Sequence, residues 1–397
     1  MAKKTLDNID VRDRRVLVRV DFNVPLSDGA VADDTRIRAA LPTIQHLIEA
    51  GARVVLCSHL GRPKGQRDAS LSLRPAAERL SELIGQDVAT ADDCVGSDVE
   101  TQVEGLRSGQ VLLLENTRFH AEEKRNDANF AQQLAKLADV YVNDAFGAAH
   151  RADASTEGVA HHVETAVMGR LMEEELHAIA QVTAQPERPL VAVLGGAKIS
   201  DKMGVLDRLQ DRADTMLVGG GMANTLLKAK GVDVGASMVE NDVLNEAERL
   251  IDDLGEDLVL PTDAVVAPEV DANADRRTVA IDDLPDDWHI LDIGPQTVTT
   301  FNGYLRDAMT VVWNGPMGVF ELEPFAEGTF AIARTMAELN AITVVGGGES
   351  GAAIYRADVV DQLTHVSTGG GAFLTLLEGS ELPGVAVLDE RRADPAY

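Results

Sequence analysis

The sequence Leu190-Val191-Ala192-Val193-Leu194-Gly195-Gly196-Ala197-Lys198 joins an apolar run directly to a glycine turn. Glycine lets a ligand approach the main chain closely, and a turn between a strand and a helix presents free backbone N–H groups to an anion. Four more glycine turns follow strand-like apolar runs in the second half of the chain. They are Gly219-Gly220-Gly221, Asn314-Gly315-Pro316-Met317-Gly318, Gly346-Gly347-Gly348-Glu349 and Thr368-Gly369-Gly370-Gly371. Together the five turns predict a sheet whose loops surround a phosphorylated ligand.

Apolar runs alternate with helical stretches along the chain, and this alternation predicts parallel sheets covered by helices on both faces. The strands expected in the first half are 15–20, 54–57, 111–114 and 140–142, with helices at 36–50 and 74–84. The strands expected in the second half are 190–194, 215–218, 258–260, 290–292, 309–313 and 342–345. The predicted fold class is therefore α/β, with two doubly wound parallel-sheet (Rossmann-like) domains joined by a hinge helix.

The length of 397 residues also favours two domains, because a single hydrophobic core stops growing before this size. Between the two halves a helix is expected from Val167 to Thr183, and Pro186 and Pro189 would end it. Its apolar face consists of Met168, Leu171, Met172, Leu176 and Ile179. The periodicity fits equally a mechanical link for domain closure and an ordinary packed crossover helix. The expected division is a first domain at 1–166, an interdomain helix or hinge at 167–185, a second domain at 186–379 and a tail at 380–397.

The net charge of −29 excludes a general nucleic-acid binder, because such proteins need a basic surface to neutralise phosphates. Lysine is scarce, with 9 lysines against 27 arginines, and the acidic residues are scattered rather than gathered in a tail. One interpretation is a halophilic protein, adapted to a salt-rich cytoplasm where ions screen the self-repulsion of the surface. The alternative is an ordinary acidic protein. We favour the salt-adapted interpretation because such a field would destabilise a compact state at low salt.

The sequence predicts neither a membrane protein nor a secreted one. No apolar run approaches the ~20 residues that span a bilayer, and charged residues near the N-terminus leave no signal-peptide core. The two cysteines, Cys57 and Cys94, are too far apart in sequence for a CxxC pair, which fits a reducing compartment. We therefore expect a cytoplasmic protein.

Polar and charged residues follow the expected strands of the first half, at the edge where ligands bind in open α/β sheets. Those singled out are Asp21, Asn23, His59, Arg62, Arg118 and Arg151, with Arg36 opening the first helix. Because the fork of an arginine binds carboxylate and phosphate through two hydrogen bonds, the set predicts a pocket for a small molecule with several negative charges. A solvated surface pair is the alternative for any single arginine, and His59 taken alone is ambiguous.

In the second half, Lys198 and Lys202 flank Ser200, which is expected to cap the N-terminus of a helix. Lysines in a first helical turn oppose the helix dipole, so a bound anion such as a nucleotide phosphate would remove the conflict. Val319 could line a base or sugar. Glu321 could accept hydrogen bonds from ribose hydroxyls, or it could be an unrelated surface carboxylate.

One motif favours a different class of enzyme. Gly346-x-Gly348-x-x-Gly351 follows an expected strand and fits the dinucleotide fingerprint, which alone would indicate an oxidoreductase. The match is weak because Glu349 would lie against a pyrophosphate, whereas a carboxylate beside phosphates suits a Mg²⁺ ligand. A non-catalytic nucleotide-binding protein is a further alternative.

Five segments together resemble the signature segments of one family, phosphoglycerate kinase. They are Arg19-Val20-Asp21-Phe22-Asn23-Val24-Pro25, Ser58-His59-Leu60-Gly61-Arg62-Pro63, Tyr141-Val142-Asn143-Asp144-Ala145-Phe146-Gly147 with His150-Arg151, Trp313-Asn314-Gly315-Pro316-Met317-Gly318-Val319-Phe320-Glu321 and Ser367-Thr368-Gly369-Gly370-Gly371. They occur in the family's order, and the resemblance extends from residue 19 to residue 387. It implies a two-domain, usually monomeric kinase of glycolysis and gluconeogenesis. The implied reaction is 1,3-bisphosphoglycerate + ADP ⇌ 3-phosphoglycerate + ATP, with Mg²⁺.

The resemblance also implies roles for individual residues. The first domain would hold the phosphoglycerate through Asp21, Asn23, Arg36, His59, Arg62, Arg118 and Arg151. The second domain would hold ATP or ADP through Gly196, Lys198, Lys202, Gly220, Asn314, Pro316, Val319, Glu321, Gly348, Glu349 and Ser350, with Glu349 as the metal ligand. The tail would return to the first domain. Because Arg36, Lys198 and Lys202 are all present, we do not expect a protein that has lost catalysis.

The implied mechanism needs no general base, because the acceptor is a carboxylate with an unperturbed pKa of about 4 that is already ionised at neutral pH. Catalysis would rest on positioning and on neutralising the transferring phosphoryl group. The groups expected to do so are Arg36, Lys198 and the backbone N–H groups of Gly370 and Gly371. Direct in-line transfer would follow hinge closure, which expels water from the site.

Two places depart from the family's usual pattern. Glu349 and Ser350 stand where aspartate and threonine are usual, and the longer glutamate would change the geometry of a metal ligand. Asp153 stands where a histidine is frequent, which leaves Arg151 in place but changes its surroundings.

Overall fold

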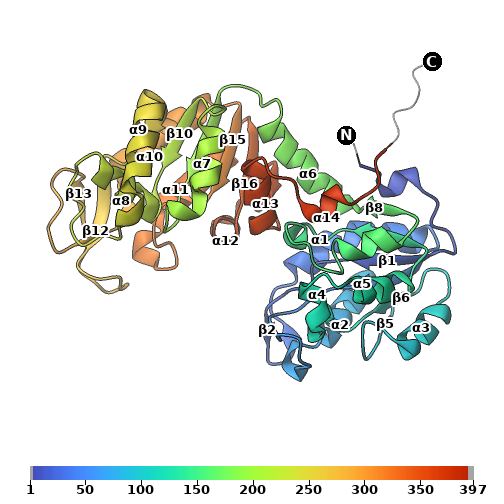
Figure 1. The fold of residues 1–397 in the computed structure, drawn as a ribbon. Coiled ribbons are helices and arrows are strands. Elements are labelled where there is room, and N and C mark those ends of the chain that lie inside the picture. Colours follow the sequence, from blue (N-terminus) through green and yellow to red (C-terminus); the bar gives the residue numbers. More distant parts are fainter. Residues whose placement is uncertain (1–2, 392–397) are drawn as a thin grey trace, which may run out of the picture. The chain divides into compact units, whose positions relative to one another are not determined.

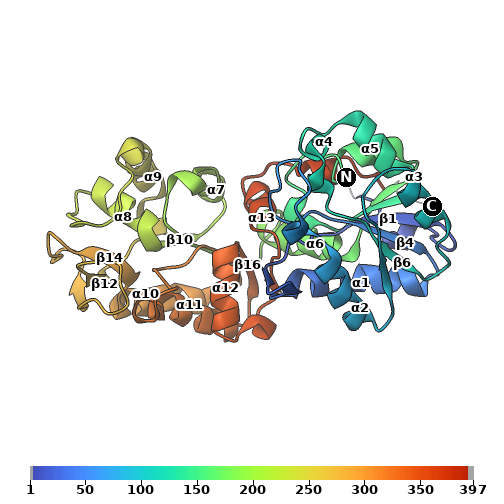
Figure 2. The same ribbon diagram turned by 90° about the horizontal axis from the view of Figure 1, so that it is seen from below.

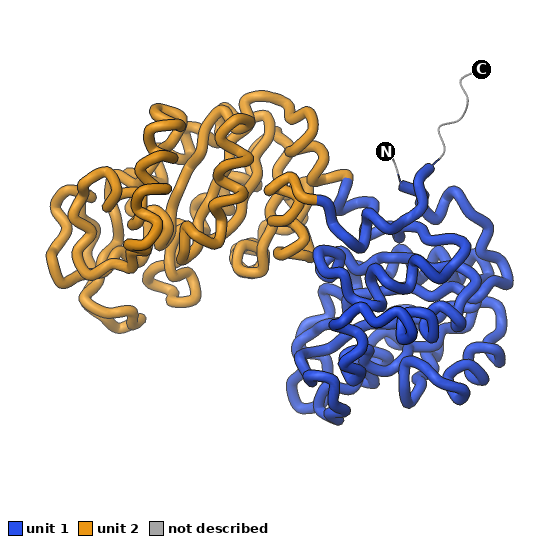
Figure 3. Tube along the Cα trace, viewed as in Figure 1, with its two compact units in different colours: residues 1–176, 381–397 blue, residues 177–380 orange. Residues whose placement is uncertain are grey.

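The computed structural model describes residues 3–391 of the chain, which divide into two compact units. Unit 1 combines residues 1–176 with residues 381–397, and unit 2 comprises residues 177–380 (Figure 3). A six-stranded parallel sheet forms the centre of each unit, and helices cover both faces of each sheet (Figures 1 and 2). The predicted α/β fold class with two parallel-sheet domains is confirmed.

The sheet of unit 1 has the strand order β5-β6-β4-β1-β7-β8, and every neighbouring pair is parallel. Its strands are β1 (Arg15–Arg19), β4 (Arg53–Cys57), β5 (Val88–Thr90), β6 (Val111–Leu113), β7 (Val140–Asn143) and β8 (Ala166–Met168). The central strands β1 and β4 are almost wholly buried, which explains why they appear in the sequence as continuous apolar runs. A separate two-stranded ribbon joins β2 (Leu26–Ser27) to β3 (Ala30–Val31).

Five helices of unit 1 cover this sheet. They are α1 (Thr35–Glu49), α2 (Arg74–Ile84), α3 (Ser97–Glu104), α4 (Ala121–Lys124) and α5 (Ala128–Ala135). Figure 2 shows α1 and α2 on one side of the strands and α4 and α5 on the other. The buried face of α1 carries Ile37, Ala40, Ile44 and Leu47, three or four residues apart, as an amphipathic helix on a sheet requires. The predictions of helices at 36–50 and 74–84 are confirmed.

The sheet of unit 2 has the order β11-β10-β9-β15-β16-β17, again with parallel pairs throughout. Its strands are β9 (Leu190–Leu194), β10 (Thr215–Val218), β11 (Leu258–Val259), β15 (Thr310–Asn314), β16 (Ile342–Gly346) and β17 (His365–Val366). Strands β10 and β11 extend the sheet on one side of β9, and strands β15, β16 and β17 extend it on the other side. The loops after β9 and β15 therefore diverge, which creates a crevice at their carboxyl ends.

A three-stranded antiparallel sheet corrects the expectation that all strands of the second half join one parallel sheet. Its order is β13-β12-β14, with β12 (Asp263–Ala267), β13 (Arg277–Ala280) and β14 (His289–Ile293). The run expected at 290–292 belongs to β14. An apolar run shows that a strand is buried but not which partner it pairs with, so the pattern could not separate the two sheets.

Seven helices complete unit 2. They are α7 (Met203–Leu209), α8 (Gly220–Ala229), α9 (Leu244–Leu254), α10 (Pro295–Asp307), α11 (Glu327–Ala337), α12 (Gly348–Arg356) and α13 (Gly370–Leu377). Figure 2 shows α7, α8 and α9 on one side of strand β10 and α10, α11 and α12 on the other. Three of the five glycine turns lead directly into a helix, because α8, α12 and α13 all begin at a glycine of such a turn.

Helix α6 (Arg170–Thr183) begins in unit 1 and ends in unit 2. The expectation that it starts at Val167 was wrong, because Val167 and Met168 belong to β8. The buried carboxylate of Asp144 accepts a hydrogen bond from the backbone N of Met172 at 3.2 Å, within the first turn of α6. A hinge role for α6 stays a prediction. None of the helices within residues 3–391 is both long enough and apolar enough to span a membrane.

The described part of the tail packs within unit 1. Helix α14 (Pro383–Ala386) lies beside β7, where Nδ2 of Asn143 donates to the carbonyl oxygen of Gly384 at 2.9 Å. Further along, the backbone N of Asp389 donates to the carbonyl oxygen of Ala166 at 2.9 Å. Unit 1 is thus assembled from both ends of the chain.

Candidate functional site

A cavity of about 630 Å³ lies at the carboxyl ends of the strands in unit 1. Its lining follows β1, β4, β6 and β7. Four residues predicted from the sequence line it, namely Asn23, Arg62, Arg118 and Arg151. The cavity is also lined by six residues that were not predicted from the sequence, namely Gly61, Lys64, Gly65, His120, Ala121 and Lys124. The lining includes five lysine and arginine side chains and no carboxylate, so the cavity suits a small molecule with several negative charges.

Arg118 lies in the loop after β6 and is held by the loop after β4. Its Nη1 donates to the carbonyl oxygen of Gly61 at 2.9 Å. Burial, followed by the charge of Arg151, lowers the pKa of Arg118 to about 10, so the side chain stays charged at neutral pH. Among the described residues its buried Nε has no hydrogen-bond partner. Because an unpaired buried donor is costly, a ligand oxygen is the natural partner for this nitrogen.

Asp153 holds two cations of this cavity from behind. Its Oδ1 accepts a hydrogen bond from Nζ of Lys124 at 2.9 Å, and its Oδ2 lies 3.9 Å from Nη2 of Arg118. The side chains of Asp153 and Arg118 are buried, so their contact is less screened by water than the contact with Lys124, which is half exposed. The position that departs from the family's pattern therefore acts on Lys124 and Arg118.

Asp21 and Asn23 hold Arg36 at the end of β1. Nη1 of Arg36 lies 3.3 Å from Oδ2 of Asp21 and donates to the carbonyl oxygen of Asn23 at 3.0 Å. Oδ1 of Asn23 accepts from the backbone N of Gly61 at 2.9 Å. The loops after β1 and β4 and the start of α1 are thus tied together. Asp21, Arg36 and His59 do not line the cavity themselves.

His59 has a partner that sequence analysis missed, the fully buried Arg19 at the end of β1. Nη2 of Arg19 lies 2.9 Å from Nδ1 of His59. A guanidinium only donates, so Nδ1 accepts and the proton of the neutral ring is on Nε2. Burial, followed by the charge of Arg19, lowers the pKa of His59 well below its ordinary value. His59 is therefore a neutral N–H donor, which resolves its ambiguity. The feature of the sequence that could have revealed this partner is Arg19, a charged residue within the otherwise apolar run 16–20.

A second cavity, of about 550 Å³, lies within unit 2. Six predicted residues line it: Gly196, Gly220, Pro316, Val319, Glu321 and Glu349. Residues that sequence analysis missed are Ala197, Gly221, Asn224, Ala236, Met238, Val270, His289, Ile290, Leu291, Asp292, Met317 and Gly318. Most of these are apolar or glycine, and several come from β14 and α8. A flat apolar group can therefore lie against one wall while polar groups meet the glycine turns.

The turns after β9 and β15 touch through their backbones at the point where the strand order reverses. The backbone N of Gly196 donates to the carbonyl oxygen of Pro316 at 2.9 Å. Gly315 has φ +92°, and a Cβ on it would lie 2.1 Å from the carbonyl oxygen of Gly195. Glycine is required here because the positive φ and the close approach both exclude a side chain.

Lys202, Asn314 and Ser350 support these turns and do not line the cavity. Nζ of Lys202 donates to the side-chain oxygen of Asn314, whose Nδ2 donates to the carbonyl oxygen of Gly346 at 2.7 Å. Oγ of Ser350 accepts from the backbone N of Gly315 at 2.6 Å. Burial lowers the pKa of Lys202 to about 8, although the carboxylates of Glu349 and Asp201 act in the opposite direction.

The predicted helix cap at Ser200 was wrong. Oγ of Ser200 donates to Glu240 at 2.6 Å, and α7 begins only at Met203. Ser200 is itself the first residue of a short 3-10 turn (Ser200–Lys202), so it precedes the N-cap position of α7 by two residues. Lys198 is exposed and precedes the helix, and Lys202 occupies its N-cap position.

The remaining predicted residues belong to the turns after β16 and β17. Gly348 is the first residue of α12, and Gly370 and Gly371 open α13. A Cβ on Gly370 would lie 3.1 Å from Cα of Gly347, so the two turns are neighbours. Glu349 is exposed in the first turn of α12. Gly348, Gly370 and Gly371 do not line the cavity.

Comparisons with known proteins agree over almost the whole chain. The family model described as phosphoglycerate kinase matches residues 6–380. A curated phosphoglycerate kinase from Pelotomaculum thermopropionicum is 56% identical over 394 residues, covering 98% of this chain and 100% of that protein. One from Gloeothece citriformis is 56% identical over 400 residues with the same coverage.

Solved structures are similar as well. Phosphoglycerate kinase from Coxiella burnetii matches with a TM-score of 0.88 and 40% identity, over 97% of this chain and 98% of that one. Phosphoglycerate kinase from Pyrococcus horikoshii matches with a TM-score of 0.86 and 35% identity, over 98% of both chains. The competing glycine fingerprint follows β16, one strand beyond the point where the strand order reverses, whereas a dinucleotide fingerprint follows the first strand. The chain belongs to the phosphoglycerate kinase family.

Proposed function

We propose that this chain catalyses reversible phosphoryl transfer between 1,3-bisphosphoglycerate and ADP, giving 3-phosphoglycerate and ATP. Its membership of the phosphoglycerate kinase family, matched over residues 6–380, supports this reaction. The observation that carries the proposal is the contrast between two cavities. The cavity of unit 1 is lined by lysines and arginines without a carboxylate, and the cavity of unit 2 is largely apolar and lined by glycine turns.

Unit 1 would bind the phosphoglycerate and unit 2 the nucleotide. Arg62, Arg118 and Arg151 line the cationic cavity and suit the phosphate and carboxylate of the acid. In unit 2, Val319 would lie against the base or sugar and Glu321 would accept from ribose hydroxyls, since both line the cavity. The phosphates of the nucleotide would be bound by the glycine turns, by the exposed Lys198 and by the buried Lys202.

The proposed chemistry follows from the charges. The acceptor carboxylate is ionised at neutral pH, so no residue needs to remove a proton from it. His59 is not suited to act as a base, because its Nδ1 is already occupied by Arg19. Catalysis then rests on cations and backbone N–H groups that neutralise the transferring phosphoryl group, namely Arg36, Lys198, Gly370 and Gly371. We also propose that the hinge closes before the in-line transfer of the phosphoryl group.

A magnesium ion is proposed as the partner of the nucleotide. Mg²⁺ usually takes one or two protein carboxylates together with substrate phosphates, and Glu349 supplies one exposed carboxylate at the rim of the unit 2 cavity. This donor set fits the ion. When bound, Mg²⁺ would neutralise charge on the phosphates.

We further propose a monomeric, cytoplasmic and halophilic protein. The net charge of −29 supports salt adaptation, because ions are needed to screen a surface field of this sign. Both cysteines, Cys57 and Cys94, are buried free thiols, which supports a reducing compartment.

The first experiment is the rate of ADP formation from MgATP and 3-phosphoglycerate, scanned from dilute buffer to multimolar KCl. We expect a rate that depends on 3-phosphoglycerate and rises with salt. A rate without phosphoglycerate is the control for simple ATP hydrolysis. Activity confined to low salt would retain the kinase and remove the halophilic proposal. Folded protein without activity at any salt would contradict the proposed function.

Nucleotide affinity is expected to fall as the pH rises above about 8. In the free protein the pKa of Lys202 is about 8, whereas a neighbouring phosphate favours the charged form and raises it in the complex. At a pH between these two pKa values, Lys202 must take up a proton when the nucleotide binds. The dissociation constant therefore increases by up to about tenfold per pH unit. Isothermal titration calorimetry of MgATP binding from pH 7 to pH 9.5, in buffers of different ionisation enthalpy, measures the dissociation constant and the number of protons taken up.

The control for this prediction is Lys202→Arg, which keeps a positive charge that does not titrate in this range. We expect this variant to bind MgATP with an affinity that is independent of pH and without proton uptake. If the wild-type affinity is equally flat between pH 7 and pH 9.5, then Lys202 does not contact the phosphates.

A further inference from the structure

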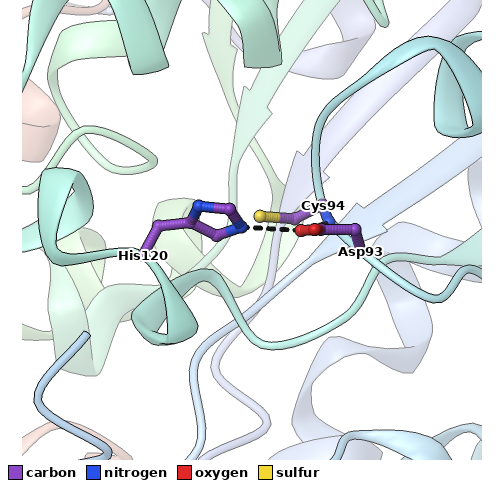
Figure 4. A group of neighbouring side chains, drawn as sticks. All are labelled: Asp93, Cys94 and His120. Atoms are coloured by element: carbon purple, nitrogen blue, oxygen red, sulfur yellow. Dashed lines mark hydrogen bonds and ion pairs between the residues drawn. The ribbon is translucent and has the colours of Figure 1, made fainter. Parts of the chain in front are cut away.

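Asp93, Cys94 and His120 form a cluster of metal-ligating side chains in unit 1. One ligand atom from each residue lies within 4.8 Å of the other two (Figure 4). Asp93 and Cys94 belong to the loop after β5, and His120 follows the short turn Thr117–Phe119 after β6. Because β5 and β6 are parallel neighbours, both loops leave the sheet at the same edge. The proposed reaction assigns no role to this cluster.

The donor atoms favour a particular class of ion. A thiolate sulfur, an imidazole nitrogen and a carboxylate oxygen together are typical ligands of Zn²⁺, whereas Mg²⁺ and Ca²⁺ prefer oxygen alone. Zinc bonds of about 2.0–2.3 Å place tetrahedral ligand atoms roughly 3.2–3.6 Å apart. The three atoms already lie within 4.8 Å, so side-chain rotations of small amplitude bring them to these distances.

One side of the cluster is buried and packed, and the other side is open to solvent. Cys94 is fully buried, and the His120 ring packs against the Phe130 ring with centroids 5.1 Å apart. The side chains of His120 and Asp93 remain 28% and 46% exposed. An ion can therefore enter between imidazole and carboxylate and meet the sulfur beneath them, with water at its fourth position.

We propose that Asp93, Cys94 and His120 form a binding site for one Zn²⁺-like transition-metal ion. The ion replaces the direct contact between Nε2 of His120 and Oδ1 of Asp93, now 2.6 Å apart. On binding, the S–H bond of Cys94 breaks, a sulfur–metal bond forms and the proton leaves to solvent. Nε2 of His120 likewise loses the proton that it donates to Asp93, so that a nitrogen–metal bond forms while the remaining ring proton is on Nδ1. His120 also lines the cationic cavity of unit 1, so the ion would lie at the border of that cavity. This site is independent of Glu349, which belongs to unit 2.

Cobalt is the probe that tests the site, because Co²⁺ takes the place of Zn²⁺ and a bound thiolate gives it a charge-transfer band in the near ultraviolet. The untagged full-length protein, freed of metal and kept reduced without thiol reagents, is titrated with CoCl₂. We expect the band to saturate at one Co²⁺ per chain, with visible bands of tetrahedral strength. Added ZnCl₂ should abolish both by displacement.

A thiolate band can be assigned to a single residue by mutation, because the chain has only two cysteines, Cys57 and Cys94. Cys57 is also a fully buried free thiol, so Cys57→Ser is the matched control and should retain the band. Cys94→Ser should lose it. Should Cys94→Ser fail to fold, His120→Asn and Asp93→Asn keep the sulfur and should each weaken Co²⁺ binding by about tenfold or more.

Three results would overturn the proposal. The first is folded wild-type protein that gives no thiolate band, which would leave His120 and Asp93 as an ordinary ion pair. The second is a band that survives in Cys94→Ser or disappears in Cys57→Ser. The third is Co²⁺ affinity unchanged in both His120→Asn and Asp93→Asn. Kinase activity is not the readout, so failure here is distinct from failure of the proposed reaction.

Discussion

Arg36→Ala is expected to lower kcat by about 10²–10³-fold while changing the KM for 3-phosphoglycerate much less. The expected loss is that of a preorganised group which neutralises charge only in the transition state. Arg36 does not line the cationic cavity, and the loop after β1 holds it through Asp21 and the carbonyl oxygen of Asn23. Steady-state rates with MgATP and varied 3-phosphoglycerate separate the two constants.

Arg38→Ala is the matched control, because Arg38 lies two residues further along α1 and forms a surface pair with Asp34 at 2.8 Å. Its side chain is 54% exposed, so the change should leave kcat within about twofold of wild type. Circular dichroism of both variants checks that the fold is retained. Near-normal kcat in Arg36→Ala, or an equal loss in both variants, would rule out a specific role for Arg36.

Gly315→Ala is expected to destabilise unit 2 by about 3 kcal/mol or more and to lower kcat/KM for MgATP by about 10²-fold. The Cβ would lie 2.1 Å from the carbonyl oxygen of Gly195 and 2.4 Å from its carbon, and neither backbone atom can rotate away. The turn after β15 must therefore shift, together with the lining residues Pro316 and Val319.

Gly231→Ala separates this contact from backbone strain. Gly231 also has a positive φ, of +82°, but nothing lies within 4 Å of a Cβ placed on it, so only a strain of about 1–2 kcal/mol is expected. Tryptophan fluorescence during urea unfolding reports on unit 2 alone, because the two tryptophans of the chain, Trp288 and Trp313, both belong to it. Equal shifts of the unfolding midpoint in the two variants would show that the contact with Gly195 is unimportant.

The sequence was informative for several buried strands and for the glycine turns, but it missed the buried strand β12. The apolar runs of β1, β4 and β9 predicted strands because both faces are covered, and the glycine turns predicted loops because few other residues fit them. Strand β5 was missed because it has only three residues, none of them fully buried. Strand β13 was missed for a similar reason, since only Val279 is even partly buried.

The two cavities differ in how far the sequence could predict them. Arg62, Arg118 and Arg151 lie in the loops that follow β4, β6 and β7, so topology alone brings them to one edge. Lys124 was missed because it belongs to α4, several residues after its strand. The apolar wall of the unit 2 cavity was missed because β14 pairs antiparallel in a separate sheet. Which residues meet across a cavity depends on pairing between distant segments, and a local pattern carries no information about that.

The composition of unit 1 from both ends of the chain has a consequence for synthesis on the ribosome. Domains generally fold as they emerge, the N-terminal one first. Here the hydrogen bonds from Asn143 to Gly384 and between Asp389 and Ala166 cannot form until residues 384–389 have left the exit tunnel. Unit 2, by contrast, is continuous from 177 to 380 and can complete its contacts earlier. The first unit to be translated is therefore the last to be finished, and a nascent chain stalled before residue 381 carries an N-terminal unit that still lacks its closing segment.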